Sequence, residues 1–335
     1  MRLPRRGVTM MVMLRPLMLT LALLLAVPAK AGPVCDAVWR DAARGRDLPV
    51  RIRLPDGDGR APAKSVPVVL FSPGLGGGII GGTLWGNAWA ARGIAVIHLE
   101  HPGSDASVYA GAANADDLKA RVRAAATGVQ LQARVGDVSF ILDELARRPR
   151  EGACDLARLN LSRIGLAGHS MGAWTAQAVA GQRYFGAAAF RDPRIVAAIA
   201  LSPSTLTTGD VSEAFGGIMI PFLSITGTAD GTPKIARDAV PSTAQIEQQA
   251  QRTGPYAGMT PGRKYLIVFQ DGDHMVFAGN LRRTPTGPDS HIQTVTARLS
   301  TAFWGMTLFG NTDDAALLAS GLTPLLAAGD RFSAK

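Results

Sequence analysis

Short apolar runs alternate with segments of helical periodicity along most of the chain. Runs that are almost wholly apolar predict strands covered on both faces, as in a parallel sheet. The expected strands are Val50–Leu54, Val68–Ser72, Ile94–Leu99, Arg163–Ala167, Ile195–Leu201, Pro221–Thr226 and Tyr265–Phe269. Between them, apolar residues recur three and four positions apart from Val135 to Leu145, which predicts a helix with one buried face.

Two further segments predict helices. Met171–Gly181 is rich in alanine and follows a strand directly, and His291–Leu308 carries apolar residues on one side. No repeat and no linker divides the chain. The pattern therefore predicts an α/β fold in a single domain, with a mostly parallel central sheet flanked by helices. The segments 202–218 and 231–262 are expected to be loop-rich insertions.

The first 31 residues have the layout of an export signal. They contain five basic and no acidic residues, an 11-residue apolar run from Leu17 to Val27, and the triplet Ala29-Lys30-Ala31. The run is too short to span a bilayer, which needs roughly 20 residues. We expect cleavage after Ala31, a mature domain of residues 32–335 without a stable membrane span, and a periplasmic or secreted location. Arg5-Arg6 leaves twin-arginine export open beside the Sec route.

Five of the basic residues behind the net charge of +9 belong to the expected export signal. The remaining 304 residues hold 30 basic and 26 acidic side chains, a net charge of +4. No run of Lys or Arg with interleaved aromatic residues remains, so no nucleic-acid partner is expected. Because an exported protein meets oxidising conditions, Cys35 and Cys154 are candidates for a disulfide. Two buried free thiols are the alternative.

The strongest local motif surrounds a serine. A predicted strand enters Gly168-His-Ser-Met-Gly172 directly and a predicted helix follows. The glycines permit a sharp turn in which larger side chains would clash with the neighbouring strand and helix, so the Ser170 hydroxyl is expected to lie exposed at the end of the strand. A chance match in a glycine-rich chain is the alternative, but the strand and helix are the context that the motif requires.

A serine needs a base that accepts its proton. Among the five histidines, His274 follows the predicted strand Tyr265–Phe269, whereas His169 lies inside the turn and is expected to point away from the hydroxyl. His291, which begins the last helix, is the reserve candidate. Enzymes built on this turn, the α/β-hydrolases, order their triad as serine, acid and histidine.

Asp230 is the acid that fits this order, because it falls just past the strand Pro221–Thr226. A role in forming a turn is the alternative for it. Asp271 and Asp273 are expected to shape the turn that presents His274. Catalysis also needs N–H donors for an oxyanion, and these are expected to be the backbone N–H groups of Met171 and Leu75.

Six motifs in the same order resemble a known group of enzymes. They are Phe71-Ser-Pro-Gly-Leu-Gly-Gly, His98-Leu-Glu-His-Pro-Gly-Ser-Asp105, Asp137-Val-Ser-Phe-Ile-Leu-Asp-Glu-Leu, Gly168-His-Ser-Met-Gly172, Gly227-Thr-Ala-Asp230 and Asp273-His274. Together they resemble the dienelactone-hydrolase-like and platelet-activating-factor-acetylhydrolase-like α/β-hydrolases. The resemblance implies a serine hydrolase with Ser170, Asp230 and His274 as triad, Leu75 and Met171 as oxyanion donors, and no cofactor.

The substrate class is less defined. A small-molecule or lipid-like carboxylic ester is expected. Dienelactone hydrolases use cysteine where this chain has Ser170, and Pro73 stands where acetylhydrolases commonly have histidine. Some motifs are also similar to bacterial cutinase-type polyester hydrolases, but 202–205 lacks their aromatic platform. Polyester and phospholipid acetyl-ester hydrolysis both remain alternatives.

Three rival interpretations come from other motifs. Gly76–Gly81 with Glu100 matches a dinucleotide fingerprint, although Pro73-Gly74-Leu75 separates it from the preceding strand. The pair His98 and His101, with Asp105 close by in the sequence, could suggest a metal site. No third ligand stands at a recognisable spacing from this pair, so no metal is expected. His101 is expected to form a hydrogen bond there. A non-catalytic binding protein of the same fold is the third, but the chain retains all three triad candidates.

Overall fold

The computed structural model describes residues 32–56, 63–205, 209–231, 243–279, 285, 287–320 and 322–335. The expected export signal, residues 1–31, lies outside the described residues. Residues Ala31–Lys335 form one unit of contacts. Within the described residues, no helix is long and apolar enough to cross a membrane.

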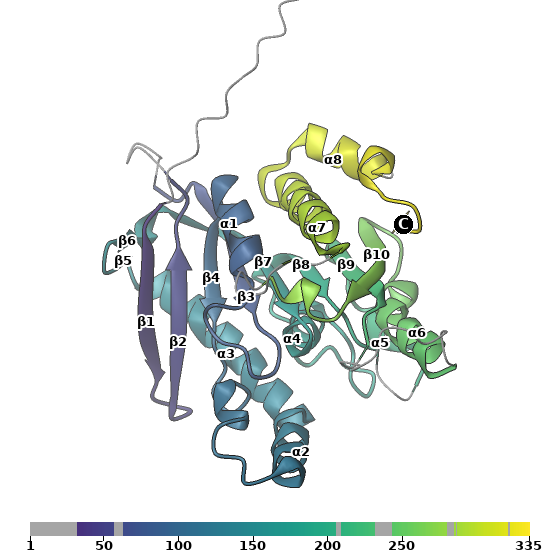
Figure 1. Ribbon diagram of the computed structural model, residues 1–335. Helices are drawn as coiled ribbons and strands as arrows, with labels where there is room; N and C mark the ends of the chain where they lie inside the picture. The colour runs from purple at the N-terminus through teal and green to yellow at the C-terminus, as the bar shows by residue number, and fades with distance from the viewer. Residues whose placement is uncertain are drawn as a thin grey trace, which may run out of the picture. The chain divides into compact units, whose positions relative to one another are not determined.

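The centre of the fold is a sheet whose strands run in the order β1-β2-β4-β3-β7-β8-β9-β10-β11 (Figure 1). The strands are β1 (Val34–Asp41), β2 (Arg46–Arg53), β3 (Val66–Ser72), β4 (Ala95–Leu99), β7 (Leu159–His169), β8 (Ile195–Leu201), β9 (Phe222–Ala229), β10 (Lys264–Asp273) and β11 (Arg331–Ala334). From β4 to β10 each neighbouring pair is parallel. All of the expected strands are present, and the expected mostly parallel sheet is confirmed.

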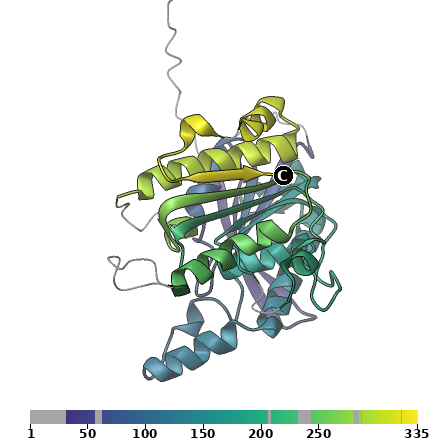
Figure 2. The ribbon, with the colours of Figure 1, turned by 90° about the vertical axis from the view of Figure 1, so that its right-hand side faces the viewer.

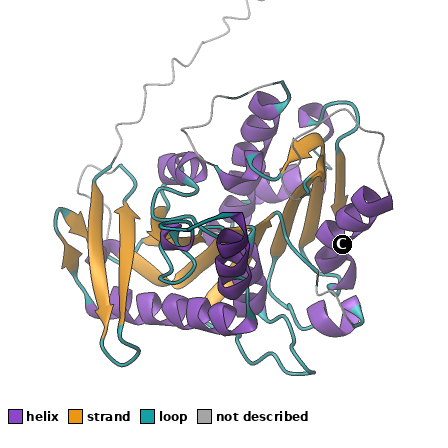
Figure 3. Ribbon diagram, turned by 60° about the horizontal axis from the view of Figure 1, so that its bottom comes forward, coloured by secondary structure: helices purple, strands orange, loops and turns teal. Residues whose placement is uncertain are grey.

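The two edges of the sheet were not expected. The strand β1 pairs with β2, and β11 pairs with β10, in both cases antiparallel. Every second residue at the start of β1 is exposed, beginning with Val34, so this strand lacks the continuous apolar run that marks the central strands. Figure 3 shows β1 and β2 together at one end of the sheet.

Helices cover both faces because alternate residues of each strand point to opposite sides. Their bounds are α1 (Thr83–Ala91), α2 (Ala115–Ala125), α3 (Gly128–Arg147), α4 (Met171–Ala180), α5 (Val211–Phe215), α6 (Thr243–Gly258), α7 (Asp289–Trp304) and α8 (Thr312–Ala319). In β3, Val69 and Phe71 pack in the cluster that contains residues of α1, α7 and α8. Val68 and Leu70 pack in the cluster that contains residues of α3 and α4. Figure 2 shows α7 and α6 on opposite sides of the strands β10 and β11.

The expected disulfide is confirmed. Cys35 in β1 is bonded to Cys154 in β6 (Cys154–Asp155), and their Cα atoms lie 6.2 Å apart. The strand β6 pairs with β5 (Arg150–Glu151) in a separate two-stranded ribbon. The bond therefore joins the edge of the main sheet to the segment that leads into β7.

The segments 202–218 and 231–262 contain more helix than expected. The short helix α5 lies in the first, and the 16-residue helix α6 occupies much of the second. Thus 231–262 is not loop-rich throughout the described part. Gly254 and Pro255 interrupt the helical pattern of the sequence, yet both lie inside α6, where contacts with α5 and β9 support the helix.

Candidate active site

Ser170 occupies the sharp turn between β7 and α4. Its backbone has φ 54° and ψ −115°, a conformation that costs about 1–3 kcal/mol for a residue with a side chain. The Ser170 N–H donates to the Leu201 carbonyl at 2.9 Å, which ties the turn to β8. A Cβ on Gly172 would collide with the Ser72 carbonyl, and one on Gly168 would collide with Gly172. Both glycines are therefore required by close packing, as expected from the sequence.

The structure brings Ser170, His274 and Asp230 together in one hydrogen-bonded chain. Ser170 lies after β7, Asp230 after β9 and His274 after β10, so the shared edge of the sheet collects all three. Ser170 Oγ lies 3.0 Å from His274 Nε2, and His274 Nδ1 lies 2.8 Å from Asp230 Oδ1. These contacts fit an imidazole whose Nδ1–H donates to the carboxylate and whose Nε2 accepts the serine proton.

The environment of Asp230 keeps its carboxylate ionised. Burial by itself raises the pKa of this group, but the hydrogen bond with His274 and the nearby Arg252 guanidinium outweigh burial, so the pKa lies below its usual value. The Thr226 hydroxyl donates to Asp230 Oδ2 at 2.7 Å. A fixed negative charge is thus held against the imidazole, which is what stabilises an imidazolium when the serine loses its proton.

Backbone contacts fix the position of His274. The Nε2–H of His169 donates to the His274 carbonyl at 2.9 Å, and the two imidazole rings lie 4.7 Å apart. Burial lowers the pKa of His169 to about 3, so this ring is neutral at ordinary pH. The Asp273 carboxylate accepts the N–H groups of Met275 and Val276, which shapes the turn as expected.

Leu75 and Met171 each line a cavity that contains Ser170. Gly74 is so close to the serine that a Cβ on it would lie 3.3 Å from Ser170 Cβ. Met171 is the first residue of α4, where backbone N–H groups lack partners in the preceding turn. In the described part of the chain, the Leu75 N–H has no acceptor among the backbone contacts of loops and turns. Both N–H groups are thus candidates for binding an oxyanion.

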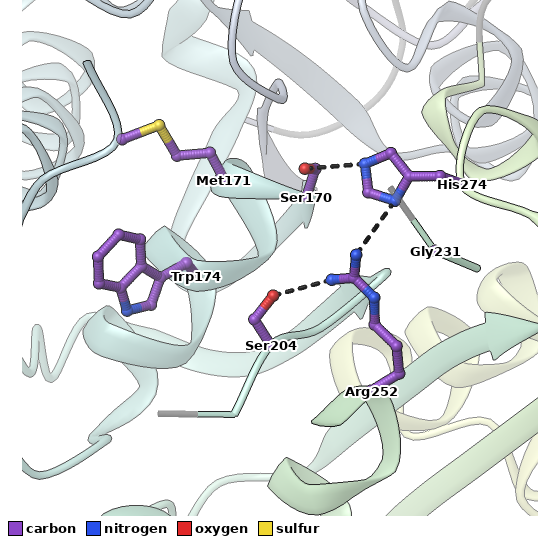
Figure 4. A pocket seen from close by; sticks show the side chains of 7 residues that line it. All are labelled: Ser170, Met171, Trp174, Ser204, Gly231, Arg252 and His274. Atoms are coloured by element: carbon purple, nitrogen blue, oxygen red, sulfur yellow. Dashed lines mark hydrogen bonds between the residues drawn. The ribbon is translucent and has the colours of Figure 1, made fainter. Parts of the chain in front are cut away.

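Two cavities meet at Ser170 and His274. The larger, about 580 Å³, is lined by the Gly74–Gly78 loop together with apolar side chains that include Ile80, Tyr109 and Met275. The smaller, about 250 Å³, is lined by Met171, Trp174, Ser204, Gly231 and Arg252 in addition to the serine and histidine (Figure 4). Both cavities therefore adjoin the Ser170 side chain.

Arg252 is a site residue that the sequence analysis missed. It reaches the site from α6, with its Nε 3.2 Å from the Asp230 carbonyl oxygen and 3.4 Å from Asp230 Oδ1. Its Nη1 donates to Ser204 Oγ at 2.8 Å and to the Pro203 carbonyl at 3.0 Å, and Figure 4 shows the guanidinium between Ser204 and His274. The side chain thus joins the turn after β8 to the acid of the site.

The other candidate histidines lie elsewhere. His98 Nδ1 contacts the Gly81 carbonyl, His101 contacts Ser72 and Asp137, and His291 pairs with Asp330. Asp105 caps a short turn through the Ser107 N–H. Within the described residues, no cluster of three or more His, Cys, Asp or Glu side chains could hold a metal ion.

The glycine loop of the dinucleotide interpretation faces the candidate site. Gly76, Gly77, Gly78 and Gly81 line the larger cavity beside Ser170. The loop is folded on itself and on a neighbour, since the Gly77 N–H donates to the Gly74 carbonyl and the Gly76 N–H to the Ser104 carbonyl. The glycine loop therefore forms part of the wall of the cavity that contains Ser170.

Comparisons with protein families and with curated proteins find no match. Among solved structures, the chain is similar to a ferulic acid esterase from Streptomyces cinnamoneus, with a TM-score of 0.56 and 22% sequence identity. The match covers 85% of this chain and 92% of the other. The chain has the α/β-hydrolase fold. At this level of identity the likeness concerns the fold, and the activity has to be argued from the residues.

Proposed function

We propose that the protein is an exported serine hydrolase that cleaves carboxylic esters through an acyl-enzyme on Ser170. The observation that carries this proposal is the hydrogen-bonded chain from Ser170 through His274 to Asp230, at the edge of an α/β-hydrolase sheet. Leu75 and Met171 would supply the oxyanion donors. The chemistry needs no cofactor and no metal.

The reaction follows from these positions. Ser170 Oγ attacks the ester carbonyl carbon while His274 Nε2 takes the hydroxyl proton, and Asp230 stabilises the resulting imidazolium. The N–H groups of Leu75 and Met171 bind the negatively charged oxygen of the tetrahedral intermediate. The alcohol leaves with the proton from His274. Water then attacks the acyl-enzyme, with the same histidine as base, and releases the acid.

The cavities support a substrate with one apolar side. The larger cavity offers Ile80, Tyr109 and Met275, and the smaller one places Trp174 beside Ser204 and Arg252. A small or lipid-like ester fits this division best. Polyester and phospholipid acetyl-ester cleavage remain the alternative functions, because both would place an acyl carbonyl at Ser170.

Export is part of the proposal. The layout of residues 1–31 and the Cys35–Cys154 disulfide both suit a protein that matures in an oxidising compartment, either periplasmic or secreted. A mature protein that begins at Gly32 is the expected product.

Turnover of p-nitrophenyl acyl esters of graded chain length tests the proposal, with methyl ferulate added because the solved neighbour is a ferulic acid esterase. Wild-type protein should hydrolyse at least one chain length, and Ser170→Ala should lose at least about 10⁴-fold in kcat. Ser162→Ala, an exposed serine on β7, is the matched control and should retain full activity. Unchanged turnover in Ser170→Ala would remove Ser170 as nucleophile, and a protein without esterase activity would favour a binding role.

A further inference from the structure

A fully buried arginine lies beneath the candidate oxyanion loop. Arg134 belongs to α3 and has no solvent exposure. Its guanidinium donates to Thr175 Oγ1, to Ser104 Oγ and to Ser72 Oγ, at 3.0, 2.9 and 3.0 Å. It also donates to the Pro73 carbonyl. One side chain thus contacts the end of β3, the loop after β4 and the helix α4.

These contacts lead to both candidate oxyanion donors. Pro73 lies two residues before Leu75, and the Ser104 carbonyl accepts the N–H of Gly76, the residue after Leu75, at 2.8 Å. On the other side, the Thr175 hydroxyl donates to the Met171 carbonyl at 3.0 Å while it accepts from Arg134 Nε. The guanidinium therefore connects the loop that carries Leu75 with the first turn of α4, which carries Met171.

A second serine, histidine and aspartate extend this network. Ser72 Oγ lies 3.0 Å from His101 Nε2, and His101 Nδ1 lies 2.9 Å from Asp137 Oδ2. All three side chains are buried, and Ser72 Oγ also accepts from Arg134, so no ester reaches this serine. The array resembles the Ser170 chain in connectivity, but its place makes it a support for β3 and the following loop.

A contribution to the stability of the fold does not by itself explain why an arginine is buried at this position. Taking a cation out of water costs several kcal/mol, and within the described residues no carboxylate forms an ion pair with Arg134. Asp137 is nearby, but its carboxylate bonds to Arg44, Arg46 and His101. A planar donor with several N–H groups is suited to holding acceptors from three separate elements in one geometry.

We propose that Arg134 is a positioning residue that holds the N–H groups of Leu75 and Met171 in register for the oxyanion, an inference that rests on the proposed ester hydrolysis. Its contacts reach the two donors through Pro73 and Thr175 and never the substrate. Its loss should therefore weaken transition-state binding more than substrate binding.

The test compares Arg134→Met, Arg134→Lys and Thr175→Val with wild type. Removal of one oxyanion donor typically costs about 10²–10³ in kcat. Because Arg134→Met shifts the donors and leaves them present, kcat should fall by about 10- to 100-fold with KM within about threefold. Inhibition by phenylboronic acid, which forms a tetrahedral adduct on the serine, should weaken by a similar factor. Arg134→Lys should lie between Met and wild type. Thr175→Val, which keeps the arginine but removes the hydroxyl that links it to Met171, should lose about 3- to 10-fold in kcat.

Lys264→Met is the matched control. Lys264 is also buried, but it lies at the first residue of β10 and donates to the Gly262 carbonyl, at the opposite end of that strand from His274. This variant should keep kcat and inhibitor affinity even if its melting temperature falls. The proposal would be overturned if Arg134→Met and Thr175→Val both fold and both keep the wild-type kcat and inhibitor affinity. It would also be overturned if Lys264→Met lost as much kcat and inhibitor affinity as Arg134→Met. If Arg134→Met does not fold, Thr175→Val decides. Ser170→Ala measured in parallel separates the two levels: turnover in that variant contradicts the proposed function itself.

Discussion

At the level of single residues, the charge and orientation of the Asp230 carboxylate depend on its neighbours. His274 and Thr226 donate to its two carboxylate oxygens, and Arg252 adds a positive charge nearby. These contacts hold the group ionised and aimed at the imidazole although it is almost wholly buried. In the proposed mechanism this acid acts through His274, so its charge and its acceptor geometry both matter.

Asp230→Asn should lower kcat by about 10³- to 10⁴-fold, because an amide can donate to Nδ1 and favours the tautomer whose Nε2 cannot accept the serine proton. Steady-state kinetics on a p-nitrophenyl ester would measure this. Asp271→Asn, which changes an exposed acid near the end of β10, should remain within about twofold of wild type. If Asp230→Asn kept a kcat as close to wild type as Asp271→Asn does, Asp230 would be excluded as the orienting acid.

The sequence was enough to predict the three residues of the proposed triad, which the structure brings together, but not the residues that support them. Ser170, Asp230 and His274 follow strands, so strand patterns and chain order place them. Arg252 could not be placed, since the path of α6 depends on tertiary contacts. Arg134 did leave a signal: it stands beside Val135 on the apolar face of α3, where a charge is unusual.

Elements differ in how clearly the sequence marks them. The central strands are buried on both faces, so their apolar runs identify them. In the edge strand β1, exposed and more buried residues alternate, and β11 is largely exposed. These strands form because β2 and β10 offer them hydrogen-bonding partners. The disulfide compensates at one of these edges by linking β1 to β6.

Replacing Cys35 and Cys154 together by serine should destabilise the protein. The bond joins two residues with a sequence separation of 119, and closing a loop of this length contributes about 4–5 kcal/mol in the chain-entropy model. Urea unfolding should therefore show a lower midpoint in the double variant, while kcat stays near wild type because the bond is remote from Ser170. Free thiols in the non-reduced wild-type protein, or an unchanged midpoint, would contradict this account.

At the scale of the whole molecule, three buried histidines tie stability to pH. Burial lowers the pKa of His98 and of His101 to about 4, and that of His169 to about 3. The unfolded chain binds protons at these positions below about pH 6.5, whereas the native protein binds them only near pH 4 or below. Native stability is therefore fully present above pH 6.5 and is lost as the pH falls toward 4.

The free energy of unfolding should fall by up to about 1.4 kcal/mol per pH unit for each of these histidines between about pH 6 and pH 4.5. Urea titrations at several pH values would measure the slope. His98→Phe should reduce it by about one proton, since His98 packs against Phe71 and its Nε2 has no partner among the described residues. A stability that does not change over this range would contradict the buried, neutral state of the three rings.

The central claim is that Ser170 carries the acyl group during turnover. The most direct measurement is peptide mass spectrometry of protein quenched with acid shortly after mixing with p-nitrophenyl acetate. The account predicts a burst of p-nitrophenol and an acetyl group on the peptide that contains Ser170, with neither in Ser170→Ala. Hydrolysis by wild-type protein with the acetyl group on another residue, or a burst that persists in Ser170→Ala, would contradict it.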